Sequence, residues 1–218
     1  MLLVILGGRC HLRSDRGEWL DVGRRRDVFS GMPYALYLPR RAELGVESVG
    51  ASLDVAYAWC GTDRDHPARL ITPEQISIEI RGGGNATRQI NGILPPGSDC
   101  HRLVSVEVYT PSGNWSSYPP HKHDEHRVDR EGNLIEADLE EVYFYKIDRP
   151  EGYAYQRIYT SDGRYDELML AQSDDLILSP EGYPPVVSAH GYTSYYLNFL
   201  AGSAQSLAST YDPQFAWV

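Results

Sequence analysis

Apolar, β-branched and aromatic residues come in short runs along this chain, and clusters of Gly, Pro, Asn and Asp separate the runs. Runs of about four to eight such residues between turn residues are typical of β-strands. No segment shows the period of an amphipathic helix over about ten residues. The pattern predicts an all-β protein of the jelly-roll sandwich type. The predicted strands are Leu2–Leu6, Tyr34–Leu38, Leu53–Ala58, Ile76–Ile80, Leu103–Tyr109, Val142–Ile147, Ala154–Tyr159, Glu167–Ala171, Asp175–Leu178, Pro185–Ser188 and Ser194–Phe199.

A pair of histidines is the clearest chemical signal in the chain. His121 and His123 stand two residues apart directly after a proline pair. On a strand, residues two apart point to the same face, so both imidazoles could grip one divalent metal while Lys122 turns away. His-x-His alone is a weak motif, and a pair of surface histidines is the alternative. Downstream, Leu139–Tyr145 predicts a strand with a carboxylate near its start, and two His with one Glu commonly bind zinc, manganese or iron.

Four stretches of the sequence resemble a known family. They read NWSSYPPHKHD, LEEVYFYKIDRPEGYAYQRIYT, DELMLAQSDDLILSPEGYPPVV and YYLNFLAGS. They are similar to the 5-deoxy-glucuronate isomerases of myo-inositol catabolism, a branch of the cupins. The likeness is strong from Arg88 to Val218 and looser from Leu3 to Pro95, and the related pectin-pathway uronate isomerases share the same arrangement. It implies a two-cupin β-sandwich enzyme that interconverts aldose and ketose forms of a sugar acid.

The resemblance also implies a division of the chain. Relatives carry further strands before the opening MLLVIL, so the N-terminal half is expected to be shortened. The glycine cluster Gly82–Asn85 and the turn Leu94–Gly97 bracket the expected seam. We therefore expect a partial N-terminal cupin half at residues 1–97 and a C-terminal cupin half at residues 98–218 that carries the metal site.

Composition narrows the class of partner. Twenty basic against 30 acidic residues give a net charge of −10, which argues against nucleic acid or an anionic membrane. A small-molecule sugar acid can still bind through a few local arginines. Cys10, Cys60 and Cys100 are odd in number and far apart, so they indicate no disulfide framework and favour a cytoplasmic location. The MLLVIL run is too short for a signal peptide and lacks a preceding basic stretch.

The resemblance assigns metal ligands residue by residue. His121 and His123 match the family's histidine pair, and Glu141 matches its glutamate, with a divalent metal, zinc or manganese, as the expected cofactor. Relatives carry a fourth ligand, the histidine of a G-Y-H-P segment, where this chain has Pro184. A water or substrate oxygen completes the shell, or His190 does, or the metal is weakly held or lost. We favour a weakened three-residue site, since catalytic metals need open positions.

Substrate and catalytic groups are predicted around this set. Arg157 and Tyr159 share one face of a predicted strand, and an arginine inside a barrel would bind the sugar carboxylate; an ion pair with Asp166 or Glu167 is the alternative. Tyr143 and Tyr145 follow Glu141 on the same face and are expected to line the pocket, although core aromatics would need no function. Arg88 also matches a family position, without an assigned role.

The expected chemistry is an aldose–ketose isomerisation, in which a proton moves between adjacent carbons through an enediol. A metal would polarise the carbonyl and hydroxyl groups. Glu167, Tyr143 or a metal-bound hydroxide could carry the proton. The resemblance implies 5-deoxy-glucuronate as substrate and 2-deoxy-5-keto-gluconate as product. Two alternatives stay open: a decayed, non-catalytic cupin that binds a sugar acid or metal, which Pro184 favours, and a metal-dependent oxygenase on the same fold.

Overall fold

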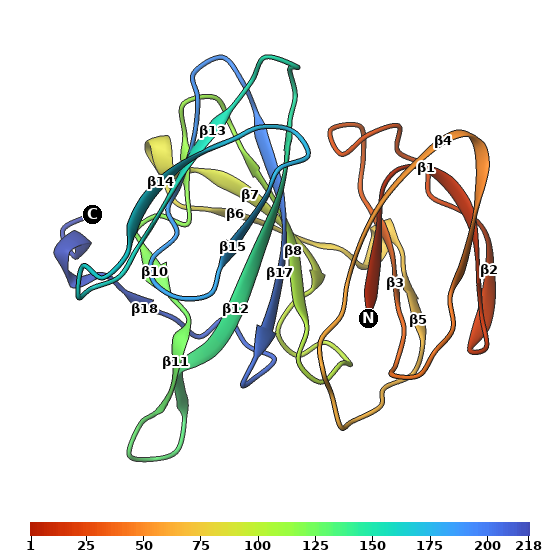
Figure 1. The fold of residues 1–218 in the computed structure, drawn as a ribbon, viewed down its shortest axis with the longest axis horizontal. Helices are drawn as coiled ribbons and strands as arrows, with labels where there is room; N and C mark the ends of the chain where they lie inside the picture. The colour runs from red at the N-terminus through yellow and green to blue at the C-terminus, as the bar shows by residue number, and fades with distance from the viewer. The chain divides into compact units, whose positions relative to one another are not determined.

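β-strands supply nearly all the regular structure in the computed structural model, which describes residues 1–218 (Figure 1). The helical segments are the short 3₁₀ turns η1 (Pro73–Gln75), η2 (Gly84–Ala86) and η3 (Pro213–Phe215). None of them has the length and apolar character needed to cross a membrane. The predicted all-β class is therefore confirmed. The chain forms two compact units, Met1–Ser77 with Ser98–Leu103, and Ile78–Gly97 with Val104–Val218.

The first unit is built on the long strand β1, which pairs with β4 along one edge and with β3 and β2 along the other. Apolar side chains of β1, including Leu3, Ile5 and Leu12, pack with Leu36 and Leu38 into its core. This burial is the main favourable term that holds the sheet together. The strands are β1 (Leu2–Ser14), β2 (Gly17–Val22), β3 (Tyr34–Tyr37), β4 (Gly45–Ala58) and β5 (Arg69–Ile71).

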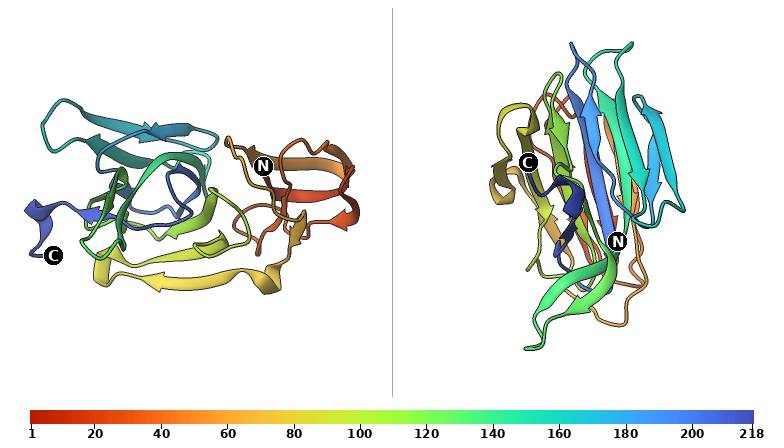
Figure 2. Two further views of the ribbon diagram at one scale, coloured as in Figure 1. Left: turned by 90° about the horizontal axis from the view of Figure 1, so that it is seen from below. Right: turned by 90° about the vertical axis from the view of Figure 1, so that its left-hand side faces the viewer.

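The second unit has two facing sheets. The larger has the strand order β11-β12-β17-β8-β7-β6, with β15 also on β12, and the smaller has the order β14-β13-β16-β9. In the left view of Figure 2, the teal strands of residues 154–171 and the yellow-green strands of residues 78–94 lie on opposite sides of this unit. The strands are β6 (Ser77–Arg81), β7 (Arg88–Leu94), β8 (Val104–Thr110), β9 (Trp115–Ser116), β10 (His121–Lys122), β11 (Asp124–Val128), β12 (Leu134–Ile147), β13 (Ala154–Tyr159), β14 (Asp166–Ala171), β15 (Leu176–Ser179), β16 (Val186–Ser188), β17 (Ser194–Gly202) and β18 (Thr210–Tyr211).

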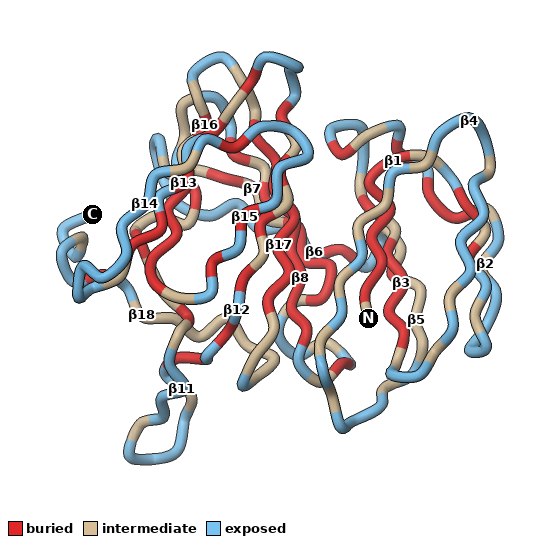
Figure 3. Tube along the Cα trace, viewed as in Figure 1, coloured by how far each residue is buried: buried red, intermediate tan, exposed pale blue.

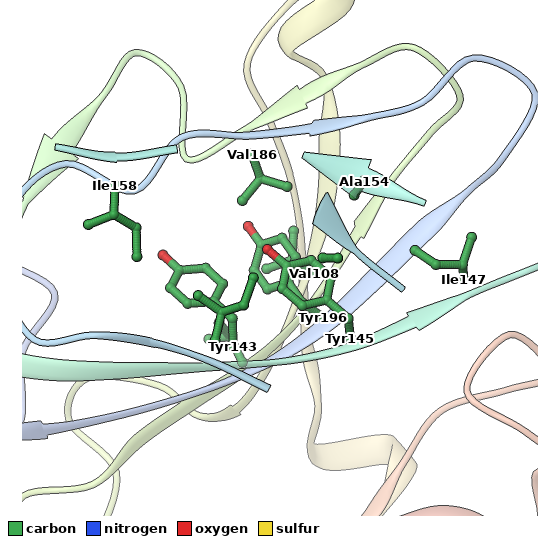
Figure 4. Packing of buried hydrophobic residues seen from close by; sticks show 11 residues of the cluster. Val108, Tyr143, Tyr145, Ile147, Ala154, Ile158, Val186 and Tyr196 are labelled. Carbon is green, nitrogen blue, oxygen red and sulfur yellow. The ribbon is translucent and has the colours of Figure 1, made fainter. Parts of the chain in front are cut away.

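Tyrosines fill the space between the two sheets. Tyr143 and Tyr145 of β12 and Tyr196 of β17 are at most 2% exposed, and their rings face Ile158 and Val186 of the smaller sheet (Figure 4). Their centroids lie 5.1 to 6.4 Å apart, a separation at which aromatic pairs add about 0.5–1.5 kcal/mol each beyond area burial. Figure 3 shows this burial along β8, β12 and β17, whereas β14 is largely exposed.

Most predicted strands are present, but several are longer or were missed. β12 begins at Leu134 rather than Val142 because its first half pairs with β11, whose charged sequence DEHRV gives no apolar run. β7, with the sequence RQINGIL, was missed because its polar positions mask the alternation. Residues 78–97 belong to the second unit, so β7 lies with the C-terminal strands rather than before a boundary at residue 97.

Candidate active site

A cavity of about 280 Å³ opens in the second unit, lined by residues of the larger sheet, of the segment before β11 and of the C-terminal segment. Its polar lining includes His121, His123 and Glu141, so the structure brings the three predicted metal ligands to one cavity. Its apolar wall is formed by Ile90, Val106, Val108, Leu200 and Leu207. The remaining lining residues are Arg81, Arg88, Ser117, Tyr143, Tyr196, Asn198, Ser209 and Tyr211.

The two imidazoles are oriented by the backbone. The Nδ1 atom of His121 lies 3.1 Å from the carbonyl oxygen of Pro119, and that of His123 lies 3.0 Å from the carbonyl oxygen of Ala208. A carbonyl can only accept, so each Nδ1 carries the proton and each Nε2 keeps a free lone pair. The rings lie 5.4 Å apart. Burial, with a smaller contribution from His123, lowers the pKa of His121 to about 4, so this imidazole is neutral at pH 7.

Glu141 is the only carboxylate among the residues that line the cavity. It projects inward from β12, whereas Glu140 on the opposite face is exposed, as the alternation along a strand predicts. Its Oε2 accepts a 2.6 Å hydrogen bond from the Tyr143 hydroxyl. Burial raises the pKa of Glu141, and burial followed by the nearby Glu141 carboxylate raises the pKa of Tyr143 well above its usual range. The pair is therefore suited to hold and exchange a proton.

A buried charge network behind the histidines holds their segment in place. Lys122 turns away from the cavity and pairs with Asp124 and, at 3.0 Å, with the fully buried Glu136 of β12. Glu136 also accepts hydrogen bonds from Arg127 at 2.8 Å and from the Thr210 hydroxyl of β18. Because Lys122 follows His121 in β10 and β18 pairs with β10, this one carboxylate of β12 ties together the two strands that hold His121.

We expect Glu136 to make the fold sensitive to acid. Burial would raise its pKa, but hydrogen bonds from Thr210, Lys122 and the backbone of Asp124 together outweigh burial and lower the pKa from 4.5 to about 2. A carboxyl group whose pKa falls on folding stabilises the protein above its unfolded pKa, and this stability is lost as the pH falls toward the folded pKa. The shift corresponds to about 3 kcal/mol.

The measurement is urea unfolding of the wild type and Glu136→Gln at several pH values. Between about pH 5 and pH 2, the wild type should lose about 3 kcal/mol of unfolding free energy that Glu136→Gln, less stable at neutral pH, does not lose. Glu140→Gln, on the exposed face of the same strand, should follow the wild type. Parallel pH profiles for the wild type and Glu136→Gln would contradict the assignment.

Arg157, the predicted carboxylate binder, lies outside this cavity. It is exposed on β13, donates two hydrogen bonds of 2.7 and 2.8 Å to Asp166 on β14, and stacks 4.1 Å above the ring of Tyr159. The placement prediction was wrong because β13 belongs to the smaller sheet, and alternate positions of that strand face outward. Its guanidinium fork is occupied by a neighbouring carboxylate, as the ion-pair alternative proposed.

Three other predicted residues also lie outside the cavity lining. Glu167 is exposed on β14, an edge strand, and is not placed to move a substrate proton in the cavity. Tyr159 shares the outer face with Arg157, and its hydroxyl donates a 2.6 Å hydrogen bond to Asp212. Tyr145 lies in the core, where its hydroxyl donates to Gln156 at 2.8 Å. Of the predicted catalytic and substrate residues, only Tyr143 lines the cavity.

The fourth-ligand candidates lie elsewhere as well. His190 is exposed in the turn between β16 and β17, beside Gly113, so it does not supply a ligand from the cavity wall. Pro184 is buried, directly after Tyr183, whose backbone pairs with Tyr159. It is absent from the cavity lining, but Gly182 of the same loop borders a smaller hollow with His123 and Glu141.

Sequence reasoning missed several lining residues. Tyr211 reaches the cavity because β18 pairs with β10, which places its ring 5.6 Å from that of His121. Tyr196 and Asn198 come from β17, where alternation within YYLNF could have indicated a shared inward face. The resemblance assigns no role to Arg88, and no sequence motif points to Arg81. Nothing local in the sequence marks these arginines as neighbours of the histidine pair.

The donor set fits a divalent transition metal in its chemistry. Two imidazoles, each with Nδ1 held by a carbonyl, and one buried carboxylate are common ligands of zinc and manganese. The three side chains face one cavity, yet no three His, Cys, Asp or Glu side chains are gathered closely enough to form a ready-made metal cluster. Metal binding therefore stays a prediction.

The sandwich and its interior His-His-Glu cavity define a cupin-type protein. Solved structures agree on the fold: a deletion mutant of the oxalate decarboxylase OxdC of Bacillus subtilis matches 96% of this chain and 64% of its own with a TM-score of 0.59, at 12% identity. An IolB-like protein from Salmonella typhimurium LT2 matches 99% of this chain and 80% of its own with a TM-score of 0.88, at 33% identity.

The family model of the KduI/IolB family matches residues 1–218, and the chain belongs to this family. The 5-deoxy-glucuronate isomerase of Geobacillus thermodenitrificans is 40% identical over 99% of this chain and 77% of its own length. That of Geobacillus kaustophilus is also 40% identical, over 99% of this chain and 76% of its own length. The chain is therefore an isomerase of this family, an intramolecular oxidoreductase.

Proposed function

We propose that this enzyme converts 5-deoxy-glucuronate to 2-deoxy-5-keto-gluconate, a step of myo-inositol catabolism. The observation that carries the proposal is that His121, His123 and Glu141 line one cavity. The relatives named for this reaction are 40% identical over nearly the whole chain. The cavity volume of about 280 Å³ lies near the lower end of the range for ligand sites, which suits a single sugar acid.

A divalent metal, zinc or manganese, is part of the proposal. His121 and His123 would hold it through their Nε2 atoms together with the carboxylate of Glu141. When bound, such a metal polarises a carbonyl and an adjacent hydroxyl and stabilises negative charge on oxygen. With Pro184 in place of the family histidine, three protein ligands remain, which leaves positions open for substrate oxygens.

Glu141 and Tyr143 are the groups placed to move the proton. The Glu141 carboxylate takes a proton from the hydroxyl-bearing carbon next to the carbonyl, and the electron pair of that C–H bond becomes the C=C bond of an enediol as the carbonyl oxygen takes up a proton. The hydroxyl on the neighbouring carbon then loses its proton and becomes the new carbonyl, while Glu141 returns a proton to the former carbonyl carbon, so one proton is gained and one lost at each pair of atoms and no co-reactant is needed. The 2.6 Å hydrogen bond from Tyr143 keeps the carboxylate oriented throughout the transfer.

The surroundings of the pair favour this transfer. Apolar side chains of β7, β8 and β17 form one wall of the cavity, which limits water and strengthens polar interactions with the sugar. The three cysteines are free, in keeping with the reducing cytoplasm, where we place the reaction.

Product analysis tests the proposal. The protein should be stripped with EDTA, reloaded separately with zinc or manganese, and incubated with 5-deoxy-glucuronate in deuterated water. We expect the ketose product to form only with metal and to carry deuterium at the former carbonyl carbon where the proton exchanges with solvent. Turnover of a pectin-pathway uronate but not of 5-deoxy-glucuronate would overturn the substrate assignment, and full turnover without metal would overturn the cofactor.

A further inference from the structure

Arg88 places a buried cation in the wall of the cavity. Arg88 is only 5% exposed. No carboxylate lies within ion-pair distance of its guanidinium group. One nitrogen, Nη1, donates to the backbone carbonyls of Ala86 and Tyr118 at 3.1 Å each. Those two bonds fix the plane of the group and leave Nε and Nη2 as donors beside the cavity. Burial of an arginine without a counter-ion is costly, so such a group is normally paired.

Arg81 differs from Arg88 in this respect. It also lines the cavity, but its side chain is half-exposed and forms a two-point ion pair with Glu79, with distances of 2.8 and 2.7 Å. An exposed and already neutralised arginine attracts an anion only weakly. The unmatched positive charge of the cavity therefore resides on Arg88, while the one negative group in the lining is Glu141.

We propose that Arg88 binds the carboxylate of the substrate and thereby fixes the direction in which a sugar acid lies in the cavity. This inference rests on the proposed function for the identity of the acid. A planar guanidinium with two free donors matches a carboxylate in a two-point contact, which an ammonium group cannot reproduce. The missing counter-ion of Arg88 is then the substrate itself.

The position of Arg88 sets the orientation of the bound acid. Arg88 contacts the carbonyl of Tyr118, and His121 contacts that of Pro119, so the arginine lies beside the segment that leads into the histidine pair. Glu141 comes from β12 and shares its hydrogen bond with Tyr143. A sugar held by its carboxylate at Arg88 directs its other end, the aldehyde, toward His121, His123 and Glu141. A neutral sugar of the same size lacks this anchor.

The test compares Arg88→Gln and Arg88→Lys with the wild type in their metal-loaded forms. Calorimetry with D-glucuronate as a probe acid and D-glucose as its neutral counterpart gives Kd, and turnover of 5-deoxy-glucuronate gives KM and kcat. We expect Arg88→Gln to weaken glucuronate binding and raise KM by about 10- to 100-fold, the usual effect of losing hydrogen bonds to a charged group. The change in kcat should be smaller, and weak glucose binding should stay unchanged.

Arg157→Lys is the matched control, because Arg157 is the exposed arginine paired with Asp166, and it should behave as the wild type. Arg88→Lys keeps the positive charge and one donor for a backbone carbonyl, so this variant should fold even if Arg88→Gln does not. Its KM should lie between those of the wild type and Arg88→Gln. Equal Kd and KM values in the wild type and both Arg88 variants would overturn the anion site. Failure of the wild type to bind both glucuronate and 5-deoxy-glucuronate would overturn it as well. Glucuronate binding that depends on Arg88, without turnover of 5-deoxy-glucuronate, would overturn the proposed reaction and support the anion site.

Discussion

Replacement of both His121 and His123 by alanine is expected to abolish the proposed binding of a divalent metal and to lower kcat/KM by about 1,000-fold or more. A catalytic metal supplies several kcal/mol of transition-state stabilisation, and each factor of ten in rate corresponds to about 1.4 kcal/mol. Glu141 alone would be left to hold the ion. Elemental analysis of the purified double variant and an isomerase assay measure the two effects together.

Exposed histidines provide controls for this experiment. His126 is exposed and bonds to Ser203 at 2.8 Å, and His190 lies in the β16–β17 turn. His126→Ala and His190→Ala should keep full metal content and activity. Metal loss in His190→Ala would restore it as the fourth ligand, and full metal content in the double variant would remove the histidine pair from the metal site. A melting curve for each variant separates metal loss from unfolding, since His121 and His123 each contact a backbone carbonyl.

Glu141→Gln should lower kcat by about 100- to 10,000-fold, the usual contribution of a positioned acid–base group, and should also reduce metal content. When both proteins are compared without metal, the variant should not be less stable than the wild type at neutral pH. Burial raises the pKa of Glu141, so the folded state disfavours the charged carboxylate, and a neutral amide of the same shape removes that cost. The melting temperature is therefore expected to stay the same or to rise.

Tyr143→Phe separates the two roles of Glu141. It removes the 2.6 Å hydrogen bond to the carboxylate but no metal donor, so kcat should fall while metal content is kept. Glu140→Gln, on the opposite face of β12, should leave both unchanged. Unchanged kcat in Glu141→Gln would exclude this carboxylate from the proton transfer, and metal loss in Tyr143→Phe would show that the hydroxyl supports the ligands rather than the proton.

The candidate site divides into residues that sequence could identify and residues that it could not. His121 and His123 were predictable as neighbours because the two-residue period of a strand fixes which side chains share a face within one segment. Glu141 came from the family resemblance, and the same period placed Glu140 on the opposite face. Tyr143 followed from the same period along β12. Arg157 and Glu167 were misplaced because the sequence gives the alternation of a strand but not the sheet to which the strand belongs.

Tertiary pairing decided the rest of the cavity. Arg88 comes from β7, and Tyr211 comes from β18, close to the C-terminal end of the chain. Each reaches the histidine pair through long-range contacts: a hydrogen bond from Arg88 to the carbonyl of Tyr118, and the pairing of β18 with β10. Such contacts leave no periodic trace in the local sequence, so neither residue could be placed beforehand.

The sequence by itself determined the all-β class, the family and the three residues proposed as metal ligands, because strand alternation and local motifs are properties of neighbouring residues. Only the tertiary structure decided which charged groups face the cavity. It placed Lys122 with the buried Glu136, Arg157 with Asp166, and Arg88 without any carboxylate partner. The physical reason is that an ion pair depends on which strands become neighbours, and that choice is made when two sheets bury their apolar faces against each other.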